Sequence, residues 1–189
     1  MRHRVFIAIN LPENVKKELN SYQFKWPELP IKWTKKDNLH ITLVFLGYLR
    51  EEELVDILKI TNNIILKHEP FFIRLKKICY GPSDKKPPRM IWVESEKSER
   101  LGKLQRDLTN SLSGFSSNPK TESGKNYTSH ITLGRLKQWE FRSIEPEERP
   151  WISEEIDLSF EVNSIDIMES HLKKGGPKYT ILESLSFPE

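Results

Sequence analysis

Short runs of β-branched and aromatic residues alternate along the chain with longer amphipathic stretches. Between Glu51 and His68 the apolar residues recur at three- and four-residue spacing, which predicts a helix with one buried stripe. Between Ile156 and Met168 apolar and polar residues alternate, which predicts a half-buried strand. By the same criteria we expect two further helices, one that begins at Pro12 and one over 99–112. We also expect further strands over 4–9, 31–34, 38–46, 71–80, 90–94, 128–135 and 179–185.

The length of 189 residues fits one domain, or two small lobes that share a core, better than two independent domains. No stretch approaches the ~20 apolar residues that cross a bilayer, and the apolar run after Arg4 is too short for a signal peptide. Cys79 is the one cysteine, which excludes an intramolecular disulfide and a cysteine-based zinc cluster. We therefore expect a cytoplasmic protein, without a membrane partner, in which residues 1–189 form a single domain.

The net charge of +3 is modest. A protein that grips a long nucleic-acid backbone usually carries a larger positive excess. The composition therefore disfavours a non-specific nucleic-acid binder, and it is compatible with a small phosphate substrate or with the end of an RNA.

The tetrapeptide His-Ile-Thr-Leu occurs once in each half of the chain, and both copies fall in predicted strands. Because side chains alternate along a strand, His40 and Thr42 should share one face, and so should His130 and Thr132. The other face of the first strand would be apolar as far as Phe45. Each half thus supplies an imidazole and a hydroxyl that project together.

Two such motifs can act on a phosphate if their strands lie side by side. One neutral imidazole takes a proton from water while the other, as imidazolium, protonates the leaving oxygen, and each contribution is typically worth ~10²–10⁴ in rate. The threonine hydroxyls can donate to the phosphate oxygens on which charge develops. A five-membered cyclic phosphate is strained, so an acid and a base can open it without a metal. His40 and His130 are therefore candidate catalytic residues, and Thr42 and Thr132 candidate substrate-binding residues.

These motifs could also be structural features without a catalytic role. A single His-x-Thr in a strand is usually an ordinary polar pair, and duplication of a lobe can repeat a strand without function. Duplication alone, however, would preserve apolar positions rather than polar ones. His3, His68 and His171 have no threonine two residues on and are interpreted as surface histidines. The sequence has no His-x-x-x-His and no cluster of acidic ligands, so we expect no metal site.

With these residues in view, the sequence resembles the two-histidine (2H) phosphoesterases, and within them the RNA 2′,3′-cyclic phosphodiesterases, also called 2′-5′ RNA ligases. The likeness covers nearly the whole chain. It rests on Trp33 and on residues 4–12, 38–47, 88–93, 129–135 and 175–182. The resemblance implies a bilobal α+β fold: two antiparallel β-sheets related by pseudo-twofold symmetry, flanked by helices, with the histidines lining a central cleft.

The resemblance also implies a function. It implies hydrolysis of RNA 2′,3′-cyclic phosphate ends to 2′-phosphate, with weak ligation that forms 2′-5′ linkages, RNA ends as partners and no cofactor. It assigns His130 as the base and His40 as the acid, which the residues alone leave open. Arg135 matches a family position that contacts the phosphate or ribose. Strand alternation would point Arg135 away from His130, but Gly134 can permit a bulge that re-aims it.

Other functions stay open from the sequence. The same chemistry could serve 2′,5′-linked oligoadenylates or small cyclic nucleotides. The cleft could also capture RNA ends without turning them over, although the presence of both histidines and both threonines favours an enzyme. We expect the protein to be a monomer.

Overall fold

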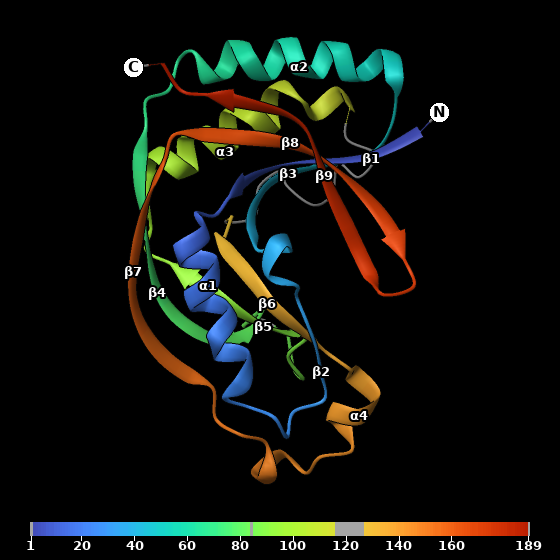
Figure 1. The fold of residues 1–189 in the computed structure, drawn as a ribbon, viewed down its shortest axis with the longest axis vertical. Helices are drawn as coiled ribbons and strands as arrows, with labels where there is room; N and C mark the ends of the chain where they lie inside the picture. Colours follow the sequence, from blue (N-terminus) through green and yellow to red (C-terminus); the bar gives the residue numbers. More distant parts are fainter. Residues whose placement is uncertain (1, 84, 116–126, 189) are drawn as a thin grey trace.

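Within the residues that the structure describes, nine strands join in one antiparallel sheet, which four α-helices accompany (Figure 1). The computed structural model describes residues 2–83, 85–115 and 127–188. The strands are β1 (Arg2–Asn10), β2 (Ile31–Trp33), β3 (His40–Arg50), β4 (Phe71–Gly81), β5 (Met90–Ser95), β6 (His130–Leu136), β7 (Ser153–Val162), β8 (Ser164–Lys173) and β9 (Gly176–Ser186), and the helices are α1 (Glu13–Ser21), α2 (Glu51–Ile65), α3 (Glu99–Ser111) and α4 (Gln138–Arg142).

The strand order in the sheet is β7-β4-β5-β6-β3-β1-β8-β9, with β2 paired to β6 as well. The two central strands, β3 and β6, carry the two His-Ile-Thr-Leu motifs. In the described part of the chain they pair only at Ile41 and Ile131. This junction divides the strands into β7-β4-β5-β6, with β2 beside β6, and β3-β1-β8-β9, so an α+β fold with two halves is confirmed. The two sheets expected from the resemblance are joined into one, because β3 and β6 are adjacent in the strand order and pair at these two isoleucines.

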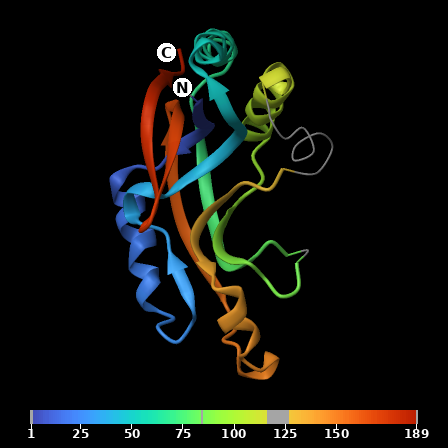
Figure 2. The ribbon, with the colours of Figure 1, turned by 90° about the vertical axis from the view of Figure 1, so that its right-hand side faces the viewer.

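The helices bury the stripes that the sequence predicts. Ile57 and Ile64 of α2 and Leu104 of α3 lie in the apolar core, together with Ile41 and Ile131 from the motif strands. Figures 1 and 2 show α2 and α3 side by side at one end of the molecule and α4 at the other. Among the described residues, no helix is long and apolar enough to cross a membrane.

One sequence prediction of an element was wrong. The single strand expected over 156–168 is two strands, β7 and β8, which end and begin on either side of Asn163. β7 pairs with β4 in one half of the sheet, and β8 pairs with β1 in the other. The change is visible in the burial pattern, because the buried positions Phe160 and Val162 are followed by Ile165 and Ile167. The apolar alternation thus shifts by one residue where the chain crosses between the halves.

Candidate active site

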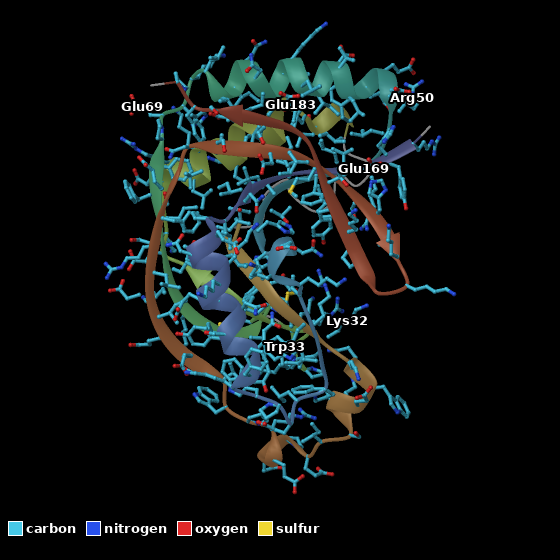
Figure 3. The ribbon with its side chains drawn as sticks, in the orientation of Figure 1. Lys32, Trp33, Arg50, Glu69, Glu169 and Glu183 are labelled. Atoms are coloured by element: carbon cyan, nitrogen blue, oxygen red, sulfur yellow. The ribbon has the colours of Figure 1, made fainter. Side chains whose placement is uncertain are left out.

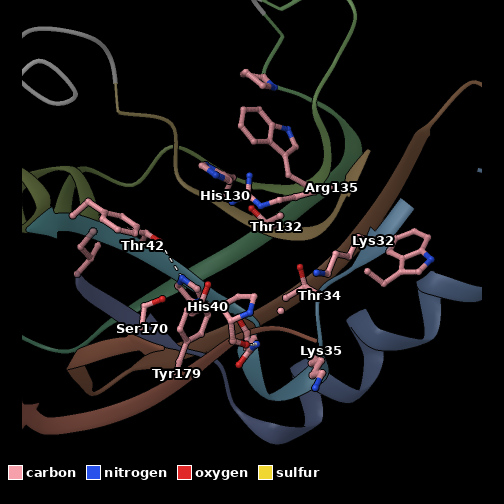
Figure 4. A pocket seen from close by; sticks show the side chains of 18 of the residues that line it. Lys32, Thr34, Lys35, His40, Thr42, His130, Thr132, Arg135, Ser170 and Tyr179 are labelled. Carbon is pink, nitrogen blue, oxygen red and sulfur yellow. Dashed lines mark hydrogen bonds between the residues drawn. The ribbon is translucent and has the colours of Figure 1, made fainter. Parts of the chain in front are cut away.

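A cleft of about 1080 Å³ lies between the two halves of the sheet. All five site residues predicted from the sequence line it: His40, Thr42, His130, Thr132 and Arg135. Figure 4 shows the first motif on one side of this cleft and the second motif on the other. The fold therefore brings together two segments that are far apart in the sequence.

The register at the junction explains how the motifs face each other. Ile41 and Ile131, the second residues of the two motifs, are directly opposite in an antiparallel pair. In that geometry the residue before one isoleucine lies toward the residue after the other. Continued along the two strands, this register would set the position of His40 against that of Thr132 and the position of Thr42 against that of His130. The imidazole of His40 itself contacts Thr42 of its own motif, with Nε2 3.0 Å from the hydroxyl oxygen.

A bulge in β6 re-aims Arg135. Thr132 lies opposite Trp92 of β5, but Gly134 lies opposite Ile91, so two residues of β6 span one step of its partner. The register shift places Arg135 on the same face as Thr132, because Met90, its own partner, shares a face with Trp92. The bulge that Gly134 was expected to permit is confirmed, and Arg135 lines the cleft.

A matching bulge in β3 overturns one sequence prediction. Thr42 lies opposite Ala8 of β1, whereas Val44 lies opposite Ile7, so Leu43 is the extra residue. The shift turns Phe45 onto the face of His40 and Thr42, where it lines the cleft with 38% of its surface exposed. Strict alternation had placed Phe45 on the apolar face, and that prediction was wrong. With the 90-residue offset between the motifs, Phe45 is the counterpart of Arg135.

Both imidazoles are held in the same way. The Nδ1 atom of His40 lies 2.7 Å from the Asn38 carbonyl oxygen, and that of His130 lies 2.9 Å from the Thr128 carbonyl oxygen. A carbonyl oxygen can only accept a hydrogen bond, so each Nδ1 carries the proton. In the neutral ring Nε2 is then the unprotonated nitrogen. Each ring is therefore oriented by backbone two residues earlier, which leaves Nε2 for chemistry.

The surroundings of the two rings favour their neutral forms. The pKa of His40 is lowered to about 4, and burial is the largest cause. The hydrogen bond to the Asn38 carbonyl raises this pKa, whereas the nearby charges of His130, Lys16 and Arg135 lower it. Burial also lowers the pKa of His130, with the Thr128 carbonyl and Glu94 opposing and Arg135 adding to the effect. His40 contacts the rings of Phe6 and Tyr179, and His130 contacts Trp92 with ring centroids 4.4 Å apart.

The backbone of the β3 bulge is fixed by side chains from elsewhere in the chain. The Tyr127 hydroxyl donates to the Thr42 carbonyl oxygen at 2.9 Å, and the buried Gln105 amide on α3 donates to the Leu43 carbonyl oxygen at 3.5 Å. The Thr42 hydroxyl in turn lies 3.0 Å from Nε2 of His40. Tyr127 lies just before the second motif, so it couples the two motifs. No local pattern in the sequence signals these contacts.

Among the described residues, the lining of the cleft does not gather a set of metal ligands. In the ranges that the structure describes, no three histidine, cysteine, aspartate or glutamate side chains group as metal ligands would. The Thr132 hydroxyl lies 3.7 Å from the Met90 sulfur. Glu94, opposite His130 in the β5–β6 register, accepts a hydrogen bond from the Trp92 indole at 3.2 Å.

Comparison with known proteins extends the likeness to named relatives. Residues 9–92 match the LigT-like phosphoesterase family. The RNA 2′,3′-cyclic phosphodiesterase of Methanocaldococcus jannaschii is 32% identical, over 95% of this chain and 98% of that protein. Its namesake from Thermotoga maritima is 31% identical, over 97% of this chain and 95% of that protein.

Solved structures share the fold. A Thermus thermophilus protein superposes with a TM-score of 0.81 at 31% identity, over 97% of both chains. Escherichia coli LigT, crystallised with 3′-AMP, superposes with a TM-score of 0.79 at 21% identity, over 100% of both chains. The relatives that are more than 30% identical over almost the entire chain decide the assignment: this protein belongs to the LigT-like phosphoesterases of the 2H superfamily, which its paired His-x-Thr motifs indicated.

Proposed function

We propose that this protein hydrolyses 2′,3′-cyclic phosphate ends of RNA to 2′-phosphates, with His40 and His130 as a metal-independent acid and base. The observation that carries the proposal is the matched anchoring of the two rings. Each Nδ1 is bound to a backbone carbonyl two residues earlier, and both rings line one cleft. The names of the relatives from M. jannaschii and T. maritima support the substrate.

In the proposed reaction a water oxygen attacks the phosphorus and the bond from phosphorus to the 3′-oxygen breaks. His130 takes the proton from water at Nε2, and His40 delivers a proton from Nε2 to the 3′-oxygen, as the family resemblance implies. The phosphate remains on the 2′-oxygen. A 5′-hydroxyl in place of water would give a 2′-5′ linkage, which is the weak ligation that the resemblance also implies.

Three side chains would hold the phosphate. The hydroxyls of Thr42 and Thr132 can donate to its non-bridging oxygens, and donors aimed at developing charge lower the barrier. The Arg135 guanidinium has a planar set of donors that suits a phosphate. In the free protein the Thr42 hydroxyl is bound to His40. A bound phosphate would therefore compete with His40 for that donor.

The direct test is incubation with an RNA that carries a defined 2′,3′-cyclic end, followed by identification of the product. We expect a 2′-phosphate, formed equally well in the presence of a chelator. A 3′-phosphate product, or activity that a chelator abolishes and metal restores, would contradict the mechanism. Faster turnover of 2′,5′-oligoadenylates or of small cyclic nucleotides would indicate that these compounds are the substrate instead. Tight binding of the RNA without any product would indicate an RNA-end binding module.

A further inference from the structure

Positive charge dominates the lining of the cleft. Of the described residues that line it, four carry a positive charge: Arg4, Lys32, Lys35 and Arg135. Glu94 is the one carboxylate among them. A single cyclic phosphate carries one negative charge, and Arg135 together with the threonine hydroxyls suffices to hold it. The remaining cations therefore need another explanation.

Lys32 lies directly opposite Arg135. The two residues are cross-strand partners in the antiparallel β2–β6 pair, so their side chains leave the same face of the sheet. Like charges in directly opposite positions destabilise a sheet. Among the described residues neither side chain forms an ion pair, whereas Lys25 and Lys36 pair with Glu154 and Glu13. The repulsion between Lys32 and Arg135 is thus left for a ligand to relieve.

The position of Lys32 continues the line of site residues. β3 meets β6 at Ile131, and β2 pairs with β6 farther along, opposite Gly134 to Leu136. Arg135 is five residues beyond His130, on the order of 15 Å along a strand that rises ~3.3 Å per residue. Lys32 therefore marks the end of the cleft remote from the junction, as Figure 4 shows. The Arg135 side chain reaches back toward His130 and Thr132, whereas the Lys32 side chain lies apart from both histidines (Figure 4), so a phosphate at the histidines and a phosphate at Lys32 would be separate groups.

The turn between β8 and β9 closes against Lys32 at this end of the cleft. A Cβ atom added to Gly176 would lie 3.5 Å from Cε and 3.6 Å from Nζ of Lys32. The Asn38 amide donates to the Pro177 carbonyl oxygen at 2.8 Å, which ties the start of β9 to the segment before β3. Figure 3 shows Lys32 between β2 and this turn. The ammonium group thus lies next to this turn, in the lining of the cleft.

From this arrangement we infer that Lys32, supported by the charge of Lys35 in the lining of the same cleft, forms a second phosphate subsite, which binds the internucleotide phosphate preceding the cyclic end of an RNA. The inference rests on the proposed function and narrows its substrate: oligonucleotides are favoured over cyclic mononucleotides, which have no second phosphate. A lysine suits this role, because its ammonium is a point charge that accepts a phosphate in several orientations.

The test compares two substrates in the double variant Lys32→Gln/Lys35→Gln. We expect kcat/KM for a cyclic-ended RNA oligonucleotide to fall about 10-fold more than kcat/KM for a 2′,3′-cyclic mononucleotide, which is the effect typical of removing a hydrogen bond to a charged group. The slope of log kcat/KM against log salt for the oligonucleotide should become shallower by ~0.7 for each phosphate that the variant no longer neutralises. Lys36→Gln is the matched control, because it removes a neighbouring charge that Glu13 already pairs.

The outcomes separate the subsite from the reaction. Equal reductions on both substrates would place Lys32 on the reacting phosphate and overturn the inference, as would an unchanged rate on the oligonucleotide. If the unaltered protein turns over neither substrate, the proposed function fails. Binding of an RNA with a 3′-phosphate then tests the subsite alone. We expect the double variant to bind this RNA more weakly, and equal binding by the two proteins would contradict the inference. Lys32→Gln should also raise the Tm of the free protein, since it removes the repulsion from Arg135.

Discussion

Ile41 and Ile131 face each other at the junction of β3 and β6, and they are the same position of the two His-Ile-Thr-Leu motifs. Because antiparallel partners run in opposite directions, this one pair joins the two motifs head to tail, and the histidine and threonine side chains of both motifs line one cleft. The apolar residue at the centre of each motif thus supports the junction, while its polar neighbours line the cleft.

Replacement of either cleft histidine should abolish most of the activity. We expect His40→Ala and His130→Ala each to lower turnover of a cyclic-ended RNA at least ~100-fold, the usual contribution of a general acid or base. His171→Ala is the control, because His171 pairs with Glu169 and does not line the cleft. Near-normal turnover by either cleft variant, with the control also active, would reject the pair as acid and base.

Much of this site follows from the sequence, because strand alternation is local. His40 and Thr42 share a face, as do His130 and Thr132, and the isoleucines between them are buried. Alternation fails where a bulge intervenes, and only Gly134 signals one of the two bulges. The β3 bulge has no glycine at Leu43, so no local signal predicts Phe45 in the cleft.

The pH dependence should reflect two histidines with lowered pKa values. One imidazole has to be neutral and the other protonated, but burial lowers the pKa of His40 to about 4 and also lowers that of His130. At pH 7 most free enzyme is therefore doubly neutral. We expect kcat/KM to rise as the pH falls from 7, to peak below about 6.5, the ordinary histidine pKa, and to fall again as both rings become protonated.

Arg135 offers a check on this profile. Its positive charge lowers the pKa of both histidines, so Arg135→Gln should move both limbs of the kcat/KM profile to higher pH, in addition to weakening phosphate binding. A wild-type profile that is flat from about pH 6 to about pH 8, or limbs that stay in place in the variant, would contradict the assignment of these limbs to the two rings.

The contacts that secure the site from a distance are beyond sequence reasoning. Gln105 belongs to a helix whose apolar spacing predicts its existence, but nothing in that spacing says that its amide reaches the carbonyl of Leu43. Lys32 and Arg135 become neighbours only because β2 pairs with β6, a strand that comes much later in the chain. Such pairings depend on the order of the strands, which the hydrophobic pattern does not determine.

Tyr127 should act as a positioning residue. Its hydroxyl donates to the Thr42 carbonyl, and the Thr42 hydroxyl is bound to Nε2 of His40. In Tyr127→Phe we expect Thr42 to lose its fixed position, which lowers kcat about 10-fold, the effect of removing roughly one hydrogen bond. A donor to Nε2 favours the neutral ring, so its loosening should raise the pKa of His40 and move the acid limb of the kcat/KM profile upward.

Tyr80→Phe provides the matched control, because its hydroxyl donates to the Pro150 carbonyl at 3.0 Å, away from the cleft lining. It should lose a comparable amount of stability without a change in the pH profile. If Tyr127→Phe leaves the profile unchanged, or if both variants move it equally, Tyr127 stabilises the fold and does not position His40 through Thr42.

Gly134 should be sensitive to the smallest enlargement, because β2 packs directly on it. A Cβ atom at Gly134 would lie 2.5 Å from Cγ2 of Ile31 and 2.8 Å from the Trp33 ring, so β2 has to move. We expect Gly134→Ala to reduce the free energy of unfolding by ~1–3 kcal/mol, as overpacking usually does, measured by urea denaturation. The same movement displaces Lys32 from Arg135, so kcat/KM for a cyclic-ended oligonucleotide should fall as well. Gly114→Ala, which meets nothing within 4 Å, should leave both quantities near their wild-type values, and equal stability of the two variants would show that β2 is not held against the bulge.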